Sequence, residues 1–128
     1  MRFNHVANRV NPFHFETVVA LFTEHLGFIE LRRTERAIWL RQPGASIDLQ
    51  LSSSDPCHRD GDKQRSQISF LSETPEMDLQ HLAVCLRARG LPACVAAYSD
   101  REFYLDAPAA FVDFVIEAML PELAEYGV

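Results

Sequence analysis

The sequence lacks any apolar run close to the roughly 18 residues that a membrane-spanning helix needs. Its amino terminus, Met1-Arg2-Phe3-Asn4-His5, also lacks the long apolar core of a secretory signal peptide. We therefore expect a cytoplasmic protein that does not enter a membrane.

The sequence is also short of basic residues and of paired cysteines. Twelve Lys and Arg stand against eighteen Asp and Glu, and the net charge of −6 argues against a nucleic-acid partner, because phosphate binding needs clustered positive charge. The three cysteines, Cys57, Cys85 and Cys94, include no Cys-x-x-Cys pair, and we expect reduced thiols. Cys57 and His58 have no second ligand pair to complete a zinc site, so we interpret them as loop.

Two segments have the apolar spacing of amphipathic helices. The first begins at Phe15 and reaches Leu26, with Gly27 placed for a left-handed C-terminal cap. The second has Thr74 as N-cap and Pro75 at its first position. Their core-facing residues are Val18, Val19, Phe22 and Leu26 in the first helix and Leu79, Leu82, Ala83 and Leu86 in the second.

Short runs typical of β-strands surround these helices. They cover residues 2–10, 29–33, 37–42, 46–51, 66–71, 94–98, 102–106 and 111–118. The order is strand, helix and three strands, twice over, which predicts an α+β fold of two βαβββ modules. A single domain over 1–128 would comprise module one at 1–51, a linker at 52–65, module two at 66–120 and a tail at 121–128. Each module is too small to bury its own helix and sheet, so both should share one core.

Alternation along the strands separates an apolar row from a polar one, because successive side chains point to opposite faces. The polar rows collect His5, Asp48, Gln50, Gln67, Asp113 and Glu117. A solvated sheet face explains any single one of these residues. A shared site is the alternative, and the arrangement of the residues favours it.

Four segments in order carry a family resemblance. They are Arg2-Phe3-Asn4-His5, the helix end Phe22–Phe28, the strand Ser46-Ile47-Asp48-Leu49 and the stretch Asp106–Phe114. With them the chain resembles the vicinal oxygen chelate superfamily, which contains glyoxalase I, extradiol dioxygenases, and fosfomycin- and bleomycin-resistance proteins. The resemblance covers nearly the whole chain and implies a curved mixed sheet with a concave cleft.

The resemblance also implies a metal site on the polar rows. Metal-dependent members take ligands from the first and fourth strand of each module, and the matching positions are His5, Asp48, Gln67 and Asp113. One nitrogen and three oxygens would suit a divalent ion such as Mg, Mn, Fe or Ni. Both carboxylates are Asp where the family has Glu, which shortens their reach by about 1.5 Å, whereas metal distances must be met to about 0.2 Å. We therefore expect weak metal binding or none.

Two functional classes stay open. In the first, the chain is a metal-dependent lyase, isomerase or dioxygenase acting on a small oxygen-rich molecule, with Asp113 as catalytic base and Glu117 as its substitute. In the second, it is a metal-free protein that binds and sequesters a small molecule of the antibiotic type. Residues assigned to the ligand cleft are Trp39, Arg41, Gln50 and Tyr104, among which Tyr104 could stack on a flat ligand while the carboxylates favour a cation. Packing in the core or in a dimer is the alternative for Trp39, and a subunit without any ligand is a third alternative.

The edges of the predicted sheets indicate how the chain associates with other copies of itself. Two open sheets leave unpaired strand edges, and the family commonly closes its clefts across two subunits. We therefore expect a homodimer whose other partner is a small-molecule ligand.

Overall fold

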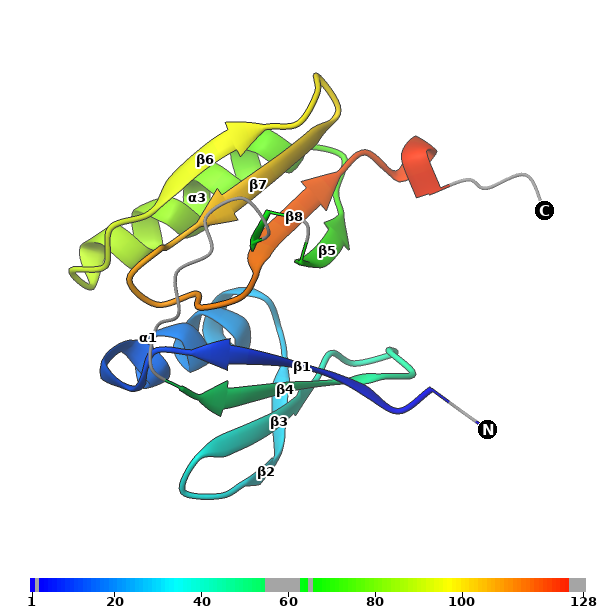
Figure 1. The fold of residues 1–128 in the computed structure, drawn as a ribbon. Coiled ribbons are helices and arrows are strands. Elements are labelled where there is room, and N and C mark those ends of the chain that lie inside the picture. Colours follow the sequence, from blue (N-terminus) through cyan, green and yellow to red (C-terminus); the bar gives the residue numbers. More distant parts are fainter. Residues whose placement is uncertain (2, 55–62, 65, 125–128) are drawn as a thin grey trace. The chain divides into compact units, whose positions relative to one another are not determined.

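Two four-stranded sheets, each packed against a helix, organise the chain (Figure 1). The computed structural model describes residues 1, 3–54, 63, 64 and 66–124. They fall into two units, one formed by residues 1–58 with Ala109–Asp113 and the other by residues 59–108 with the chain from Phe114 onward. The order strand, helix and three strands occurs twice, so the predicted α+β architecture of two βαβββ modules is confirmed.

The first unit contains a mixed sheet with the strand order β1-β4-β3-β2. β1 is parallel to β4, and the other neighbours are antiparallel. The strands are β1 (His5–Val10), β2 (Ile29–Arg33), β3 (Ala37–Arg41) and β4 (Asp48–Ser53). Most predicted core positions of this unit are buried: Val18, Val19, Phe22, Ile38, Leu40, Leu49 and Leu51. Leu26, also predicted to face the core, is only half-buried at the end of the helix.

The helix of the first unit changes its hydrogen bonding at Leu21. α1 (Phe15–Ala20) continues into the π-helical segment η2 (Leu21–His25). The Leu26 N–H donates to the carbonyl of Leu21, five residues earlier, which is the π pattern. Gly27 follows with a φ of +72°, so the predicted left-handed cap is confirmed.

The second unit repeats this arrangement with the strand order β5-β8-β7-β6. Its elements are β5 (Gln67–Leu71), α3 (Pro75–Ala88), β6 (Cys94–Ala97), β7 (Glu102–Asp106) and β8 (Val115–Met119). β5 is parallel to β8, and the remaining pairs are antiparallel. α3 covers one face of the sheet (Figure 1) and packs on β6, β7 and β8. The buried residues between them include Leu79, Leu82, Ala83, Leu86, Phe103, Leu105, Ile116 and Ala118.

Most predicted strands differ from the structure at an end, and two of these differences matter for the site. β4 begins at Asp48 and includes Ser52 and Ser53, which the prediction places in the linker. The run predicted at 111–118 is not one strand, because Phe111 forms an isolated antiparallel bridge with Val10 of β1 and β8 begins only at Val115. The physical reason is a change of pairing partner: residues 109–113 belong to the first unit, and the chain from Phe114 onward belongs to the second.

Two short helical segments complete the described structure, η1 (Pro12–His14) and η3 (Pro121–Ala124). Part of the predicted linker at 52–65 lies outside the described residues, namely residues 55–62, with Cys57 and His58, and residue 65. The same holds for residues 125–128 of the predicted tail. Within the part of the chain that is described, the helices are too short or too polar to span a membrane.

Candidate functional site

The polar face of the first sheet gathers five of the predicted site residues. His5 of β1 is the register partner of Asp48 of β4, so both side chains lie on one face. Gln50 of β4 pairs with Trp39 of β3 on that same face, and Arg41 alternates with Trp39. The alternate residues of β3 and β4 are buried on the helix side, so this face points away from α1.

The carboxylates of this unit are held by guanidinium groups. Arg41 Nε donates to Asp48 Oδ1 at 2.5 Å, and this hydrogen bond, together with the Coulomb attraction of the same carboxylate, raises the pKa of Arg41. Asp113 accepts from the Arg9 backbone N–H at 2.9 Å and from Arg9 Nε at 3.1 Å, so both of its oxygens are used. Each Asp therefore has an arginine of its own unit as counter-ion.

The indole ring of Trp39 is also covered by a side chain of the same sheet. The guanidinium carbon of Arg32 lies 4.9 Å from the centroid of the Trp39 ring, within cation–π range. Gln50 Nε2 donates to Ser52 Oγ at 3.2 Å on the same strand. On this face, then, the residues assigned to a ligand cleft contact other side chains of the same unit.

In the second module, the side chains that could bind a metal ion differ from those that alternation predicted. Because β8 begins at Val115, Asp113 does not continue the strand row of Glu117. The register pairs His5 with Asp48 in the first sheet and Gln67 with Val115 in the second. Val115 therefore stands where Asp48 stands in the first module, and the acidic side chain on β8 is Glu117.

Glu117 is the buried charged side chain of the described structure, with 7% of its surface exposed. It is the register partner of Ser69 on β5 and of Tyr104 on β7, so all three share the face turned away from α3. Ser69 Oγ donates to Glu117 Oε1 at 2.7 Å. Among the described residues, no Lys or Arg forms an ion pair with Glu117. Within the described part of the chain, the carboxylate is therefore buried without a basic counter-ion.

Two tyrosines stand beside this carboxylate. The rings of Tyr98 and Tyr104 have centroids 4.7 Å apart, and Tyr98 OH donates to the Gln64 carbonyl at 2.6 Å. Burial raises the pKa of Tyr98, a hydrogen bond with the Gln67 side chain lowers it, and the negative charge of Glu117 raises it again. Gln67 Nε2 also donates to the Gln64 carbonyl, at 3.2 Å, so Gln67 of β5 and the Tyr98 hydroxyl share one acceptor.

A second carboxylate on this face is neutralised. Asp106 alternates with Tyr104 along β7 and accepts from Lys63 Nζ at 2.6 Å. The two side chains are only 18% and 13% exposed, respectively. Glu102, at the start of β7, lies on the same face and is half-buried, so Glu117 is the buried carboxylate of this face.

The sequence prediction missed Ser69, Tyr98, Lys63 and Asp106 as parts of this site. Ser69 lies in the polar row of Gln67, and Tyr98 follows Cys94 and Ala96 in alternation, so period-two reasoning could have found both. Lys63 and Asp106 are 43 residues apart in sequence, and no local pattern connects them.

The predicted metal ligands fit a preformed metal centre poorly. A divalent ion at His5, Asp48, Gln67 and Asp113 would have to displace Arg41 from one carboxylate and Arg9 from the other. In the second module, Gln67 faces Val115, which offers no ligand atom. Carboxylate oxygens are the ligands that hard divalent ions prefer, and Glu117 supplies a pair of them without a resident cation.

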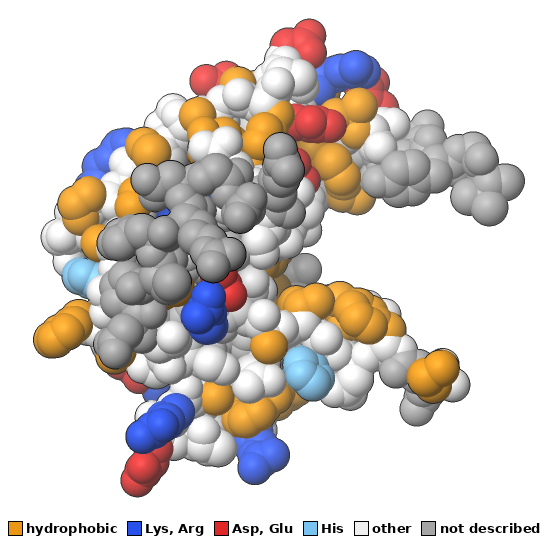
Figure 2. Space-filling model, in the orientation of Figure 1, with side chains coloured by type: hydrophobic (Ala, Val, Ile, Leu, Met, Phe, Trp, Pro, Cys, Tyr) orange, Lys and Arg blue, Asp and Glu red, His pale blue; other side chains and the backbone are white. Residues whose placement is uncertain are grey.

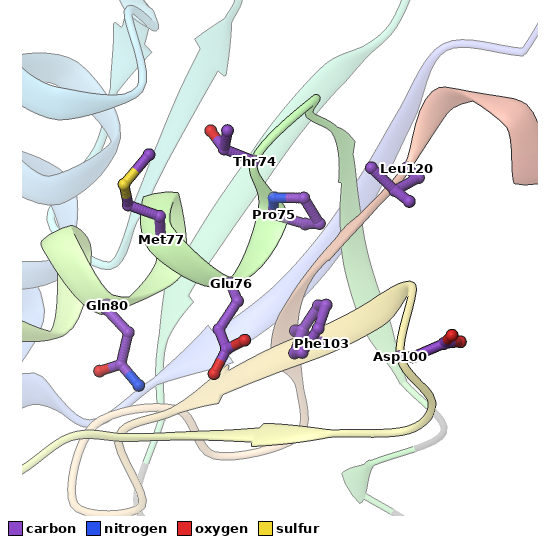
Figure 3. Close-up of a pocket in the computed structure, with 8 residues that line it drawn as sticks. All are labelled: Thr74, Pro75, Glu76, Met77, Gln80, Asp100, Phe103 and Leu120. Carbon is purple, nitrogen blue, oxygen red and sulfur yellow. The ribbon is translucent and has the colours of Figure 1, made fainter.

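A surface pocket lies apart from these faces, at the start of α3 (Figure 3). Its volume is about 510 Å³, in the range of small-molecule sites. Figure 3 shows Glu76 and Gln80 pointing to the same side of α3, toward Phe103 of β7. The full lining consists of Thr74, Pro75, Glu76, Met77, Gln80, Asp100, Phe103 and Leu120, and none of the predicted site residues belongs to it.

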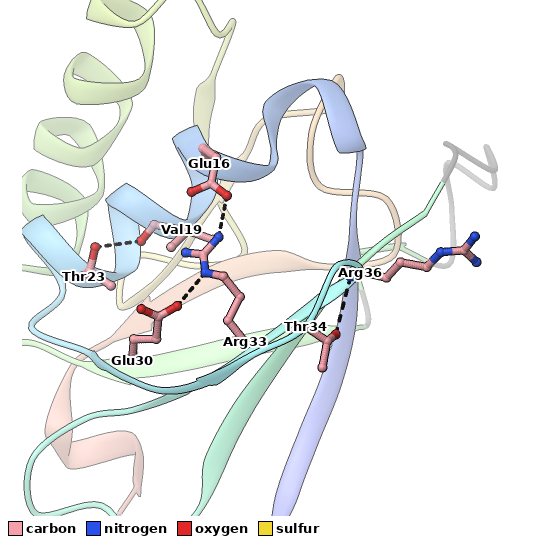
Figure 4. Close-up of polar contacts among 7 residues, drawn as sticks. All are labelled: Glu16, Val19, Thr23, Glu30, Arg33, Thr34 and Arg36. Atoms are coloured by element: carbon pink, nitrogen blue, oxygen red, sulfur yellow. Dashed lines mark hydrogen bonds and ion pairs between the residues drawn. The ribbon is translucent and has the colours of Figure 1, made fainter.

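A smaller hollow of about 240 Å³ in the first unit is occupied at its edge by an ion-pair network (Figure 4). Arg33 Nη1 donates to Glu16 of α1 at 2.5 Å, and Arg33 Nε donates to Glu30 of β2 at 2.6 Å. The hydrogen bond with Glu30, then that with Glu16, raises the pKa of Arg33. This network joins helix to sheet, and we assign it a structural role.

Charged side chains are distributed over the surface in Figure 2. On the face drawn there, basic side chains of the described residues are scattered, whereas a nucleic-acid site gathers them into one stripe or patch.

Sequence comparison with known protein families gave no match. A search of curated proteins likewise found none that matches.

Solved structures, in contrast, match the chain over most of its length. A possible glyoxalase from Bacillus cereus has a TM-score of 0.61 and 18% identity, over 93% of this chain and 98% of its own. The fosfomycin resistance protein FosX from Listeria monocytogenes, solved with Mn(II) and a sulfate ion, has a TM-score of 0.62 and 12% identity, over 93% and 89%. The antibiotic binding protein TnmS3 from a Streptomyces species has a TM-score of 0.58 and 17% identity, over 94% and 96%.

These matches agree with the element order and the two sheet topologies. In this chain the duplicated βαβββ unit places β1 beside β4 and β5 beside β8. The chain thus has the fold of the vicinal oxygen chelate superfamily, the group of glyoxalases and of fosfomycin- and bleomycin-resistance proteins.

Proposed function

We propose that this chain binds a small, flat organic cation on the face of the β5-β8-β7-β6 sheet turned away from α3, and that it does so without a metal. The observation that carries the proposal is Glu117, a carboxylate with 7% exposure that accepts a hydrogen bond from the Ser69 hydroxyl and forms no ion pair with the other described residues. Burying an ion without an opposite charge costs several kcal/mol, and a bound cation would recover part of that cost.

The surroundings of Glu117 select the shape of the ligand. Tyr98 and Tyr104 present adjacent rings on the same face, and aromatic rings attract cations and stack on flat groups. Asp48 and Asp113 already have arginine partners, and Asp106 has Lys63. Glu117 is the buried carboxylate on these faces, whereas Glu102 is half-buried, and we assign the charge of the ligand to Glu117.

One structural neighbour supports small-molecule binding as a use of this fold. TnmS3 is described as an antibiotic binding protein. The sequestering alternative, with Tyr104 stacking on a flat ligand and acidic side chains favouring a cation, agrees with the geometry around Glu117.

Calorimetric titration with N-methylquinolinium tests this proposal. We expect binding to the wild-type protein and a loss of affinity of about tenfold or more, or about 1.4 kcal/mol per tenfold step, in Glu117→Gln. Neutral quinoline of nearly the same shape should bind more weakly than the cation. The matched control is Glu76→Gln, which removes a carboxylate from the α3 pocket and should leave the affinity unchanged. If Glu76→Gln lowers the affinity and Glu117→Gln does not, the cation binds in the α3 pocket and the proposal is wrong.

A metal-dependent activity on an oxygen-rich small molecule is the second candidate. It is favoured by the Mn(II) in FosX and by the buried carboxylate of Glu117. The residues that the sequence predicts as ligands, His5, Asp48, Gln67 and Asp113, would hold the ion, which would act as a Lewis acid on substrate oxygens. Of Asp113 and Glu117, the register favours Glu117 as the ligand or base on β8.

Manganese titration, followed by the loss of the free-ion electron paramagnetic resonance signal, separates the two candidates. Under the metal-free proposal, wild-type protein leaves the signal unchanged. The double variant Asp48→Glu, Asp113→Glu restores the family's longer carboxylates, and tight binding by that variant alone would mark a metal site weakened by short reach. Tight binding by the wild type would favour the second candidate.

We also propose that the chain forms a homodimer. β2 is an edge strand of the first sheet, and it exposes Ile29 and Leu31 at 52% and 44%. Exposed apolar edge strands are usually covered by a partner. Sedimentation should give about twice the chain mass of 14.6 kDa, and Leu31→Lys should shift the equilibrium toward monomer. A wild-type monomer at micromolar concentration would exclude the dimer.

A further inference from the structure

α3 carries a metal-ligating pair that belongs to neither sheet face. His81 and Cys85 are four residues apart, so one turn of the helix places both side chains on the same side. Cys85 Sγ and His81 Nε2 are 3.8 Å apart. His81 is exposed and Cys85 is half-buried, which leaves the pair accessible at the surface of the second unit.

The separation of the two atoms is close to that of a tetrahedral chelate. Zinc binds thiolate at about 2.3 Å and imidazole at about 2.0–2.1 Å, and a tetrahedral angle then puts the two donors about 3.5 Å apart. The observed 3.8 Å exceeds this by a few tenths of an ångström. Small rotations of the two side chains would close the difference, because the helix backbone already sets their spacing.

We propose that His81 Nε2 and Cys85 Sγ bind a thiophilic divalent metal ion, zinc above all. Thiolate and imidazole favour Zn²⁺, Co²⁺ and Ni²⁺ over Mg²⁺ or Ca²⁺, which prefer oxygen ligands. This pair therefore prefers different metal ions from those that the carboxylate-rich sheet faces would bind. Two protein ligands leave positions for water, so the ion is exchangeable and bound with modest affinity.

Cobalt is the probe for this site, because thiolate coordination to Co²⁺ gives a near-ultraviolet charge-transfer band. The experiment uses the full chain with Cys57→Ser and Cys94→Ser, so that Cys85 is the remaining thiol. Titration with CoCl₂ should produce the band, and stoichiometric Zn²⁺ should abolish it. The matched control keeps Cys94 and carries Cys57→Ser with Cys85→Ser, and it should produce no band.

His81→Ala distinguishes the chelate from a thiol acting alone. Removing the imidazole should weaken cobalt binding about tenfold or more, at the scale of a lost coordinating contact. Circular dichroism of each variant checks that α3 is intact, and His81→Gln serves if the Ala variant unfolds. No band in the Cys85-only protein, or equal affinity after loss of His81 in a folded variant, would overturn the proposal. Glu117→Gln should leave cobalt binding unchanged, because this site is independent of the proposed cation site.

Discussion

The two units differ in how they treat their carboxylates. In the first, Asp48 and Asp113 each accept hydrogen bonds from an arginine, and both remain partly solvated. In the second, Glu117 is more deeply buried and accepts from a hydroxyl, while Asp106 on the same face is paired with Lys63. A compensated carboxylate contributes to the fold, whereas an uncompensated buried one reduces stability, which is a common cost at binding sites.

The largest expected effect comes from turning Asp106 into a second uncompensated carboxylate. Lys63→Met removes the cation from a pair that is less than a fifth exposed. Breaking a fully buried pair costs about 3–5 kcal/mol, and with the remaining exposure we expect about 2 kcal/mol. Urea denaturation measures the loss. Lys63→Met with Asp106→Asn should recover most of it, and a single variant as stable as wild type would contradict this account of the pair.

Replacing Glu117 should have the opposite effect and raise the free energy of unfolding. Glu117→Gln removes a desolvated charge and keeps an acceptor for the Ser69 hydroxyl, so the unliganded protein should gain about 1 kcal/mol in the free energy of unfolding. Thermal denaturation without ligand is the measurement. A clear loss of stability would mean that the carboxylate is compensated in the folded protein.

Asp113 provides the matched substitution in the first unit. Asp113→Asn keeps an oxygen for the Arg9 backbone N–H but loses the attraction of the guanidinium. Exposed ion pairs are worth about 0.2–1 kcal/mol, so we expect a loss of about 0.5 kcal/mol. Urea denaturation at low salt should show it, and a gain like that of Glu117→Gln would remove the contrast between the units.

The smallest expected effect is a difference in stability between wild type and Tyr98→Phe at alkaline pH. The pKa of Tyr98 is raised in the folded state above its ordinary 10.0, chiefly by burial, so the unfolded chain ionises first. The stability that this group contributes is complete below pH 10 and decreases as the pH rises above it toward the raised folded value. Tyr98→Phe should therefore lose less stability than wild type when the pH is raised past 10. Parallel curves for the two proteins would contradict the assignment.

Much of the fold followed from the sequence because its signals are local. Period-two alternation identified the buried row of β4, and Thr74-Pro75 and Gly27 marked helix ends. In β8 it was a poor guide, because Val115 to Ala118 are all buried. The register of β1 with β4 then brought His5 beside Asp48, as residues of one polar row should be.

The site was less predictable because its contacts are not local. Asp113 follows the alternation of β8 in sequence, but the chain changes its pairing partner at Phe114, so the residue bonds to Arg9 instead. Arg41 was assigned to a ligand, and its partner is Asp48. Whether a carboxylate keeps its charge for a ligand depends on such tertiary pairing, which no sequence period reveals.

The most direct test of the central claim is to locate the bound cation. Nuclear Overhauser effects between N-methylquinolinium and protein with labelled tyrosine rings and methionine methyls would show which residues contact it. The account predicts effects to Tyr98 and Tyr104, beside Glu117, and none to the methyl of Met77 in the α3 pocket. Contacts to Met77 without contacts to either tyrosine would contradict it.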